Sequence, residues 1–182
     1  VLFRSKKSGC PVLGYDIDEC RMHRFVAAGG SAARKSNEIY ENCDIILQIL
    51  PTHETISDSV KRAAESGKPG NIIVDLSSAA PHIIMSLEEN VKNAGMHLLD
   101  SPVSGGNPKA AAGTLAIMTG GEKSVFEQVK PILECMGTPV YTGSLGSGSI
   151  TKLVNNTIAG AYLAAIAEGY AFAAKAGIDL MT

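Results

Sequence analysis

Short apolar runs alternate with amphipathic segments along most of this chain of 182 residues. Several runs are apolar on both faces, which is typical of strands in a parallel sheet covered by helices on both sides. The pattern predicts an α/β fold with a doubly wound, mostly parallel sheet, followed by one long helix. The expected strands are Cys10–Asp16, Ile45–Leu50, Ile72–Leu76, His97–Leu99, Thr114–Thr119 and Pro139–Thr142. The expected helices are Glu19–Ala28, Thr55–Ser66, Pro81–Ala94, Ser124–Met136 and a final helix from about Ser149.

The composition is that of an ordinary globular protein. Hydrophobic residues make up 45% and charged residues 19% of the chain, and the formal net charge is -2. This charge gives no reason to expect nucleic acid or an anionic membrane as a partner. The 4 cysteines and 4 histidines are scattered and include no C-x-x-C pair, so we expect neither a metal site nor a redox motif.

We expect no targeting or membrane segment. Val1–Gly14 carries cations but lacks the long apolar core of a signal peptide. The apolar run Leu153–Ala174 is interrupted by Asn155 and Glu168 and is rich in glycine and alanine, which favours a helix packed against protein over a membrane span. Because the cysteines look like free thiols, the cytoplasm, or an organelle matrix, is the expected location.

Asp16 stands at the end of the first expected strand. In dinucleotide-binding folds an acidic residue at this place accepts hydrogen bonds from the adenosine ribose hydroxyls and repels a 2′-phosphate, which favours NAD over NADP. The alternative is that Asp16 is a turn or N-cap residue, a role for which Asp18 is equally suited.

Two further strands end in residues that suit a ligand-binding edge. Leu50 and Pro51 close the second expected strand, with Thr55 just beyond them, and Ser78 follows the third. Ligands bind at the carboxyl ends of strands in open α/β sheets, so these backbone groups and small hydroxyls could line the nicotinamide-ribose side of a dinucleotide. The alternative is a pair of ordinary strand-to-helix turns.

Ser104, Gly105 and Gly106 form a third candidate, after the strand that runs into Asp100. A serine followed by two glycines exposes backbone N–H groups that, with the hydroxyl, can hold a carboxylate. The alternative is a tight turn in which glycine supplies a positive φ.

Lys152 and Asn156 lie four residues apart on the last expected helix and therefore share one face. Because Leu153 and Val154 make this helix otherwise apolar, Lys152 should lie near a buried face. Burial lowers the pKa of a lysine and allows it to shuttle a proton, and Asn156 could hold the lysine or a substrate hydroxyl. The alternative is a surface lysine and an asparagine near a helix start.

Taken together, these segments resemble the β-hydroxyacid dehydrogenases, which include 3-hydroxyisobutyrate dehydrogenase and tartronate semialdehyde reductase. The most specific pieces are DSPVSGGNPKAAAGTLAIMTGG (Asp100–Gly121) and GSGSITKLVNN (Gly146–Asn156). IVDLSSAAP (Ile73–Pro81) and the run Gly160–Asp179 look closest to the tartronate semialdehyde reductase branch, also known as 2-hydroxy-3-oxopropionate reductase. The related 6-phosphogluconate dehydrogenases carry a histidine where this chain has Asn155, which speaks against that branch.

The resemblance implies a Rossmann-type NAD-binding domain over residues 1–145. Residues 146–182 would form the long interdomain helix that opens an all-helical domain, with Gly143–Gly148 as the boundary. The residues implied to bind the substrate carboxylate are Ser104, Gly105 and Gly106. The catalytic residues implied are Lys152, as general acid/base, and Asn156, in support. The residues implied to contact NAD are Asp16, Leu50, Pro51, Thr55 and Ser78.

The chain departs from the family pattern at both ends. The first strand with its G-x-G-x-x-G loop has no counterpart in the sequence, and the family continues past Thr182 with helices that carry dimer contacts. We therefore expect a chain truncated at both ends, inactive by itself, and a homo-oligomer when complete. We also expect a gap between the strands Cys10–Asp16 and Ile45–Leu50, and an exposed apolar final helix.

The expected function is that of an NAD-dependent oxidoreductase that converts a short β-hydroxy acid to its semialdehyde, with NADP a less favoured cofactor. One alternative is a tartronate or succinic semialdehyde reductase that works mainly toward the alcohol. Another is a non-catalytic binding module that keeps the fold, against which Lys152 and Asn156 argue. The expected partner is a small hydroxy acid or semialdehyde.

Overall fold

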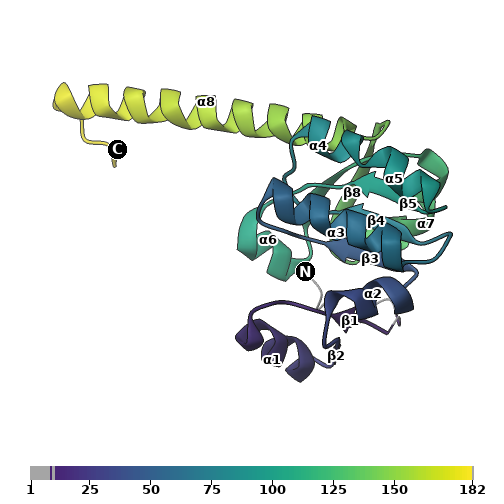
Figure 1. Ribbon diagram of the computed structural model, residues 1–182. Coiled ribbons are helices and arrows are strands. Elements are labelled where there is room, and N and C mark those ends of the chain that lie inside the picture. The colour runs from purple at the N-terminus through teal and green to yellow at the C-terminus, as the bar shows by residue number, and fades with distance from the viewer. Residues whose placement is uncertain (1–8, 10, 182) are drawn as a thin grey trace.

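Residue 9 and residues 11–181 are described in this computed structural model (Figure 1). Cys10 of the first expected strand, and residues 1–8 of the segment tested for a signal peptide, lie outside the described residues. The strands are β1 (Leu13–Gly14), β2 (Ser31–Ala32), β3 (Ile45–Gln48), β4 (Ile72–Asp75), β5 (His97–Asp100), β6 (Val103–Ser104), β7 (Leu115–Gly120) and β8 (Gly137–Gly143). The helices are α1 (Glu19–Ala27), α2 (Ser36–Asn42), α3 (His53–Ser66), α4 (Pro81–Ser86), α5 (Glu88–Asn93), α6 (Gly106–Ala112), α7 (Lys123–Glu134) and α8 (Ser147–Lys175).

The strands form two separate sheets. β1 and β2 pair in parallel as a two-stranded sheet, which lies with α1 below the rest of the molecule in Figure 1. The six-stranded sheet has the order β3-β4-β5-β7-β6, and β8 pairs with β7. Within the described part of the chain β1 and β3 belong to different sheets, so the expected gap between these two strands is confirmed.

The larger sheet is mixed, whereas the sequence pattern predicted a mostly parallel one. β3, β4 and β5 run parallel, with Gln48, Asp75 and Asp100 in register at their carboxyl ends. Only Ser101 and Pro102 separate β5 from β6, which leaves no room for a crossover helix between them. β7 then returns antiparallel to both β5 and β6, while β8 lies parallel to β7.

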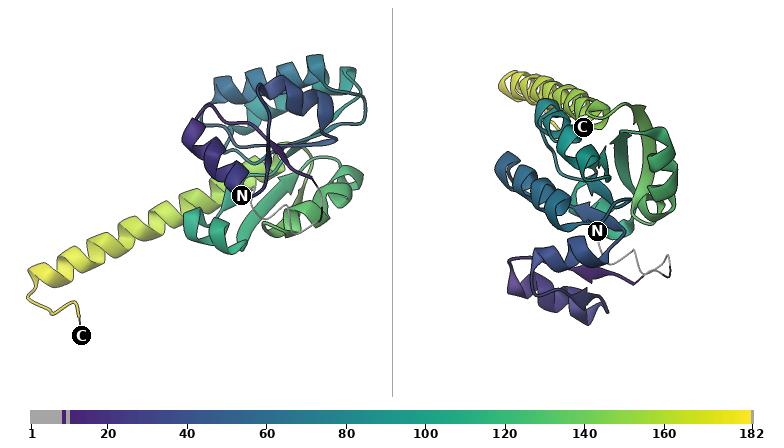
Figure 2. Two further views of the ribbon diagram at one scale, coloured as in Figure 1. Left: turned by 90° about the horizontal axis from the view of Figure 1, so that it is seen from below. Right: turned by 45° about the vertical axis from the view of Figure 1, so that its right-hand side comes forward.

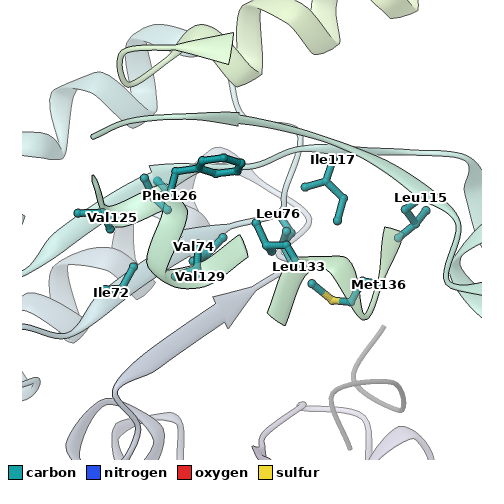
Figure 3. Close-up of a cluster of buried hydrophobic side chains, with 11 residues drawn as sticks. Ile72, Val74, Leu76, Leu115, Ile117, Val125, Phe126, Val129, Leu133 and Met136 are labelled. Carbon is teal, nitrogen blue, oxygen red and sulfur yellow. The ribbon is translucent and has the colours of Figure 1, made fainter. Parts of the chain in front are cut away.

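The apolar core lies on both faces of this sheet. Ile72 and Val74 of β4 belong to one cluster, together with Leu133 of α7 and other residues of β7 and α7 (Figure 3). Ile73, between them on β4, belongs to the other cluster, with residues of α3, α4 and α5. This alternation explains why β4 is apolar at each of the three positions before Asp75, since both of its faces are covered by helices.

The expected helix over Pro81–Ala94 is broken into α4 and α5. The hydroxyl of Ser86 donates to the carbonyl of Ile83 at 2.7 Å, and the N–H of Leu87 donates to Ile84, three residues back, at 3.2 Å. A serine that bonds a backbone carbonyl in this way competes with the regular helical ladder. The sequence pattern also missed the short elements β2, α2, β6 and α6.

α8 begins against the sheet and then projects away from the body as a rod (Figures 1 and 2). Large apolar side chains along it are exposed, so the expected exposed final helix is confirmed. By length and composition alone α8 could cross a membrane, and 0% of its most apolar window is buried in the structure. The expectation that the apolar run Leu153–Ala174 packs against protein is not met within the described residues.

Core packing yields a stability prediction with a matched control. Ile73→Ala removes a side chain that is 0% exposed on the central strand, and should lower the free energy of unfolding by about 2–5 kcal/mol because it leaves a cavity. Ile17→Ala changes the same residue type at a position that is 90% exposed. This substitution should change the free energy of unfolding by less than about 0.5 kcal/mol. Urea unfolding checks both, and equal losses would contradict this description of the core.

Candidate functional site

The loops after β3 and β4 meet at the carboxyl edge of the sheet. The N–H of Leu50 donates to the Ser77 hydroxyl at 2.9 Å, and that hydroxyl donates to Asp75 Oδ1 at 2.6 Å. This chain of bonds places half-buried Leu50 beside the turn that carries exposed Ser78. The structure therefore brings together two of the predicted cofactor contacts and adds Ser77, which the sequence analysis did not single out.

Thr55 and its neighbours hold the start of α3. Thr52 Oγ1 accepts from the Thr55 N–H at 3.2 Å and Thr55 Oγ1 accepts from the Thr52 N–H at 3.2 Å, in a reciprocal capping box. His53 Nε2 accepts from the Ala80 N–H at 3.3 Å and so links this loop to the one after β4. Exposed Pro51 lies between these capping residues and Leu50. The contacts of Pro51 and Thr55 with NAD stay predictions.

Asp16 and Asp18 have separate roles after β1. Asp18 is the N-cap of α1 and accepts from the Arg21 N–H at 3.2 Å. Asp16 accepts from the Asp18 N–H at 3.0 Å and pairs with the Arg21 guanidinium at 3.5 Å. Since Asp18 caps the helix, Asp16 is left at the strand end with a half-buried carboxylate. Arg21 is a second charged residue there that the sequence analysis missed.

Ser104 ends β6, and the two glycines after it begin α6. Gly105 has φ +136° and Gly106 has φ +67°, so the tight-turn interpretation of these glycines is correct for the backbone. A Cβ at Gly105 would lie 2.7 Å from the side chain of Lys109. The turn leaves both glycines exposed beside the half-buried serine, which is compatible with the predicted role in carboxylate binding.

α8 brings its polar face to this loop. Asn155 Nδ2 lies 3.5 Å from Ser104 Oγ and 3.5 Å from the Oδ1 of Asn156. Lys152 lies three and four residues before these asparagines, on the same face of the helix. Its side chain is half-buried, and this burial lowers the pKa of Lys152. The predicted catalytic lysine and carboxylate loop are thus neighbours, with Asn155 as an unforeseen link between them.

Two carboxylates are buried beneath these loops. Asp75 and Asp100 are each 1% exposed and are register partners on adjacent strands. Burial raises the pKa of both groups; the charge of Asp100 raises that of Asp75 further, while hydrogen bonds from Ser77 and Gln48 oppose the rise. Asp75 Oδ2 and Gln48 Oε1 have no hydrogen-bond partner among the described residues. Both residues lie at the strand ends, where a polar ligand edge is expected.

The residues that follow β1, β3 and β4 have the chemistry to hold a dinucleotide. Asp16 supplies a carboxylate that can accept from ribose hydroxyls. The loops of Leu50 and Ser78 supply backbone groups and a hydroxyl on the strand-end side of the sheet. Among the described residues no cluster of histidine, cysteine and acidic side chains is suited to hold a metal ion.

The buried carboxylates yield a prediction for the pH dependence of stability. Because the pKa of Asp75 is raised on folding, the native state binds more protons than the unfolded state above an aspartate pKa of about 3.9. The free energy of unfolding should therefore fall as pH rises through the window between that value and the raised pKa. Asp75→Asn should remove part of this slope in urea titrations between about pH 4 and 7. Identical slopes in the two proteins would contradict the prediction.

Comparison with known proteins assigns the chain to a family. The model for the NAD-binding domain of 6-phosphogluconate dehydrogenase matches residues 2–146. The 2-(hydroxymethyl)glutarate dehydrogenase of Eubacterium barkeri is 34% identical over 176 residues, which are 94% of this chain and 58% of that protein. An NAD-dependent L-serine dehydrogenase of Pseudomonas aeruginosa is 30% identical over 95% of this chain and 59% of its own length.

A solved structure agrees with these relatives. The 3-hydroxyisobutyrate dehydrogenase of Mycobacterium tuberculosis, determined with L-serine, superposes with a TM-score of 0.93 at 29% identity, over 98% of this chain and 62% of that one. The chain thus spans less than two thirds of the length of each of these proteins. The expected resemblance, the α/β fold and NAD as the cofactor are confirmed. The chain belongs to the family of the NAD-binding domain of 6-phosphogluconate dehydrogenase.

Proposed function

We propose that the protein oxidises a short β-hydroxy acid to its semialdehyde, with Lys152 as the general acid/base. The contact of Asn155 with Ser104 carries this proposal, because it sets the face of α8 that bears Lys152 against the predicted carboxylate loop. The names of the relatives support the substrate class, since 3-hydroxyisobutyrate, serine and 2-(hydroxymethyl)glutarate all bear a hydroxyl on the carbon β to a carboxylate.

The residues divide the reaction among them. Ser104, with the backbone at Gly105 and Gly106, would hold the substrate carboxylate and so orient the hydroxyl toward α8. Lys152 in its neutral form would accept the hydroxyl proton on Nζ, and its lowered pKa increases the neutral fraction near neutral pH. NAD, when bound, supplies the acceptor for the hydride of the carbinol carbon. Asn156, one turn beyond Lys152, would hold the hydroxyl or the lysine in place.

The reverse direction uses the same residues. A semialdehyde reductase, acting for example on tartronate or succinic semialdehyde, would have Lys152 protonated as the acid that completes the alcohol. A half-buried lysine beside the substrate loop argues against the third possibility, a binding module without catalysis. We further propose that residues 146–182 form an interdomain helix, with a cytoplasmic or organelle-matrix location and assembly of the complete protein as a homo-oligomer.

Replacement of Lys152 tests the catalytic assignment. In the product of the full open reading frame, Lys152→Ala should lower kcat by about 10²–10⁴-fold, the usual contribution of a general acid/base. The dissociation constant for NAD, measured by calorimetry, should stay nearly unchanged. Lys130→Ala, which removes a half-buried lysine of α7 that pairs with Glu127, serves as the control and should leave both quantities unaltered. A Lys152→Ala enzyme that keeps more than about a tenth of wild-type kcat would refute the assignment.

Asp16 and Arg21 together test the predicted preference for NAD. Asp16→Ala should weaken NAD binding, because a ribose hydroxyl loses its acceptor. It also removes one of the two carboxylates paired with the Arg21 guanidinium, the other being that of Asp18 at 3.3 Å, so binding of NADP should improve. The double variant with Arg21→Ala should lose that gain. Calorimetry with both dinucleotides measures these affinities, and a wild-type protein that prefers NADP would show the assignment of Asp16 to be wrong.

A further inference from the structure

Asp100 holds the beginning of α8 through two backbone hydrogen bonds. Its Oδ1 accepts from the Gly146 N–H at 2.8 Å, and its Oδ2 accepts from the Ser149 N–H at 2.7 Å. The acceptor comes from β5, 46 and 49 residues earlier in the chain. Bonds from N–H groups to a charged, buried acceptor are about twice as strong as neutral ones.

This carboxylate replaces an ordinary N-cap. The N-cap residue of α8 is Gly146, at φ +91°, which makes no side-chain capping bond. A serine, threonine or aspartate within the helix normally fills this place. Here the carboxylate of Asp100 lies at the positive end of the helix dipole, although Asp100 is a residue of β5 and not of α8. The first turn of α8 is therefore tied to β5 rather than capped by its own sequence.

The packing around Asp100 leaves no room for the junction to shift. A Cβ added at Gly148 would lie 2.6 Å from the Asp100 carbonyl oxygen, and one added at Gly120 would collide with Asp100 Oδ1. Both positions therefore require glycine because the strand end and the helix start approach each other so closely.

Asp100 also stands where the two halves of the proposed site diverge. The chain leaves it as the segment that leads to Ser104, and the helix that it caps reaches Lys152 one turn after Ser149. We propose that Asp100 is the positioning residue that sets the distance between the substrate loop and Lys152. This inference rests on the proposed function for its catalytic consequence, but not for its structural one.

Asp100→Asn tests the inference because it keeps the shape of the side chain and places an amide donor against one of the two N–H groups. In the full-length protein, kcat should fall by about 10–100-fold, since a misplacement of about 1 Å can cost that much. The dissociation constant for NAD should change by less than about twofold, because Asp100 bonds α8 and none of the loops proposed to contact NAD. The pH midpoint of kcat should move upward as Lys152 becomes less buried. No carboxylate of the described residues forms an ion pair with Lys152, so burial is the relevant cause.

Asp75→Asn is the matched control. It changes an equally buried aspartate in the same register, whose side chain bonds Ser77 and Gln48 and not α8. It should leave the pH midpoint of kcat in place. Amide hydrogen exchange gives a readout independent of activity: the Gly146 and Ser149 amides should exchange faster in Asp100→Asn and at the wild-type rate in Asp75→Asn.

The possible outcomes separate this inference from the proposed function. A wild-type protein without activity on β-hydroxy acids would refute the proposed function, and selective exchange at the two amides would still support the anchoring of α8. An active wild type, together with an Asp100→Asn variant that matches Asp75→Asn in pH midpoint and exchange, would overturn the inference. If Asp100→Asn does not fold, Ser149→Pro removes one of the two donors within the first helical turn. It should move the pH midpoint of kcat in the same direction and speed exchange of the remaining Gly146 amide.

Discussion

The register between β4 and β5 determines the rest of this site. It sets Asp75 and Asp100 side by side at the carboxyl edge of the sheet, where each carboxylate organises one loop system. Asp75 acts through Ser77 on Leu50, and Asp100 acts directly on the first turn of α8. A shift by one residue would place the two side chains on opposite faces of the sheet. The apolar residues of β4, packed on both faces, prevent that shift.

Burial of two adjacent carboxylates opposes folding, and the site retains them nevertheless. The pKa of both groups is raised because burial disfavours their charged forms. Asp100 offsets this cost with two backbone N–H donors, whereas Asp75 Oδ2 finds no partner among the described residues. Polar groups held at such a cost are more typical of functional edges than of cores selected only for packing.

The two parts of α8 differ in how they contact the rest of the molecule. Its first turn is buried and tied to β5, and its next turn carries Lys152 and Asn155 beside the substrate loop. Beyond these residues the apolar side chains are exposed, and the helix projects away from the body in Figure 2. Within the described chain the rigid part of the helix is therefore the part that bears the proposed chemistry. A general acid/base benefits from this, because its distance to the substrate must be held closely.

Periodicity in the sequence was enough to determine the α/β class, the strands β3, β4 and β5, and the candidates Lys152 and Ser104. These follow from local patterns, since strands covered on both faces are apolar throughout and strand ends recur at one edge. The break at Leu87, the antiparallel return of β7 and the separation of β1 from β3 were decided by tertiary structure. So were the link from Asn155 to Ser104, the pair of Arg21 with Asp16 and the cap from Asp100. Each depends on backbone geometry or on contacts between segments distant in the chain, which spacing along a sequence does not encode.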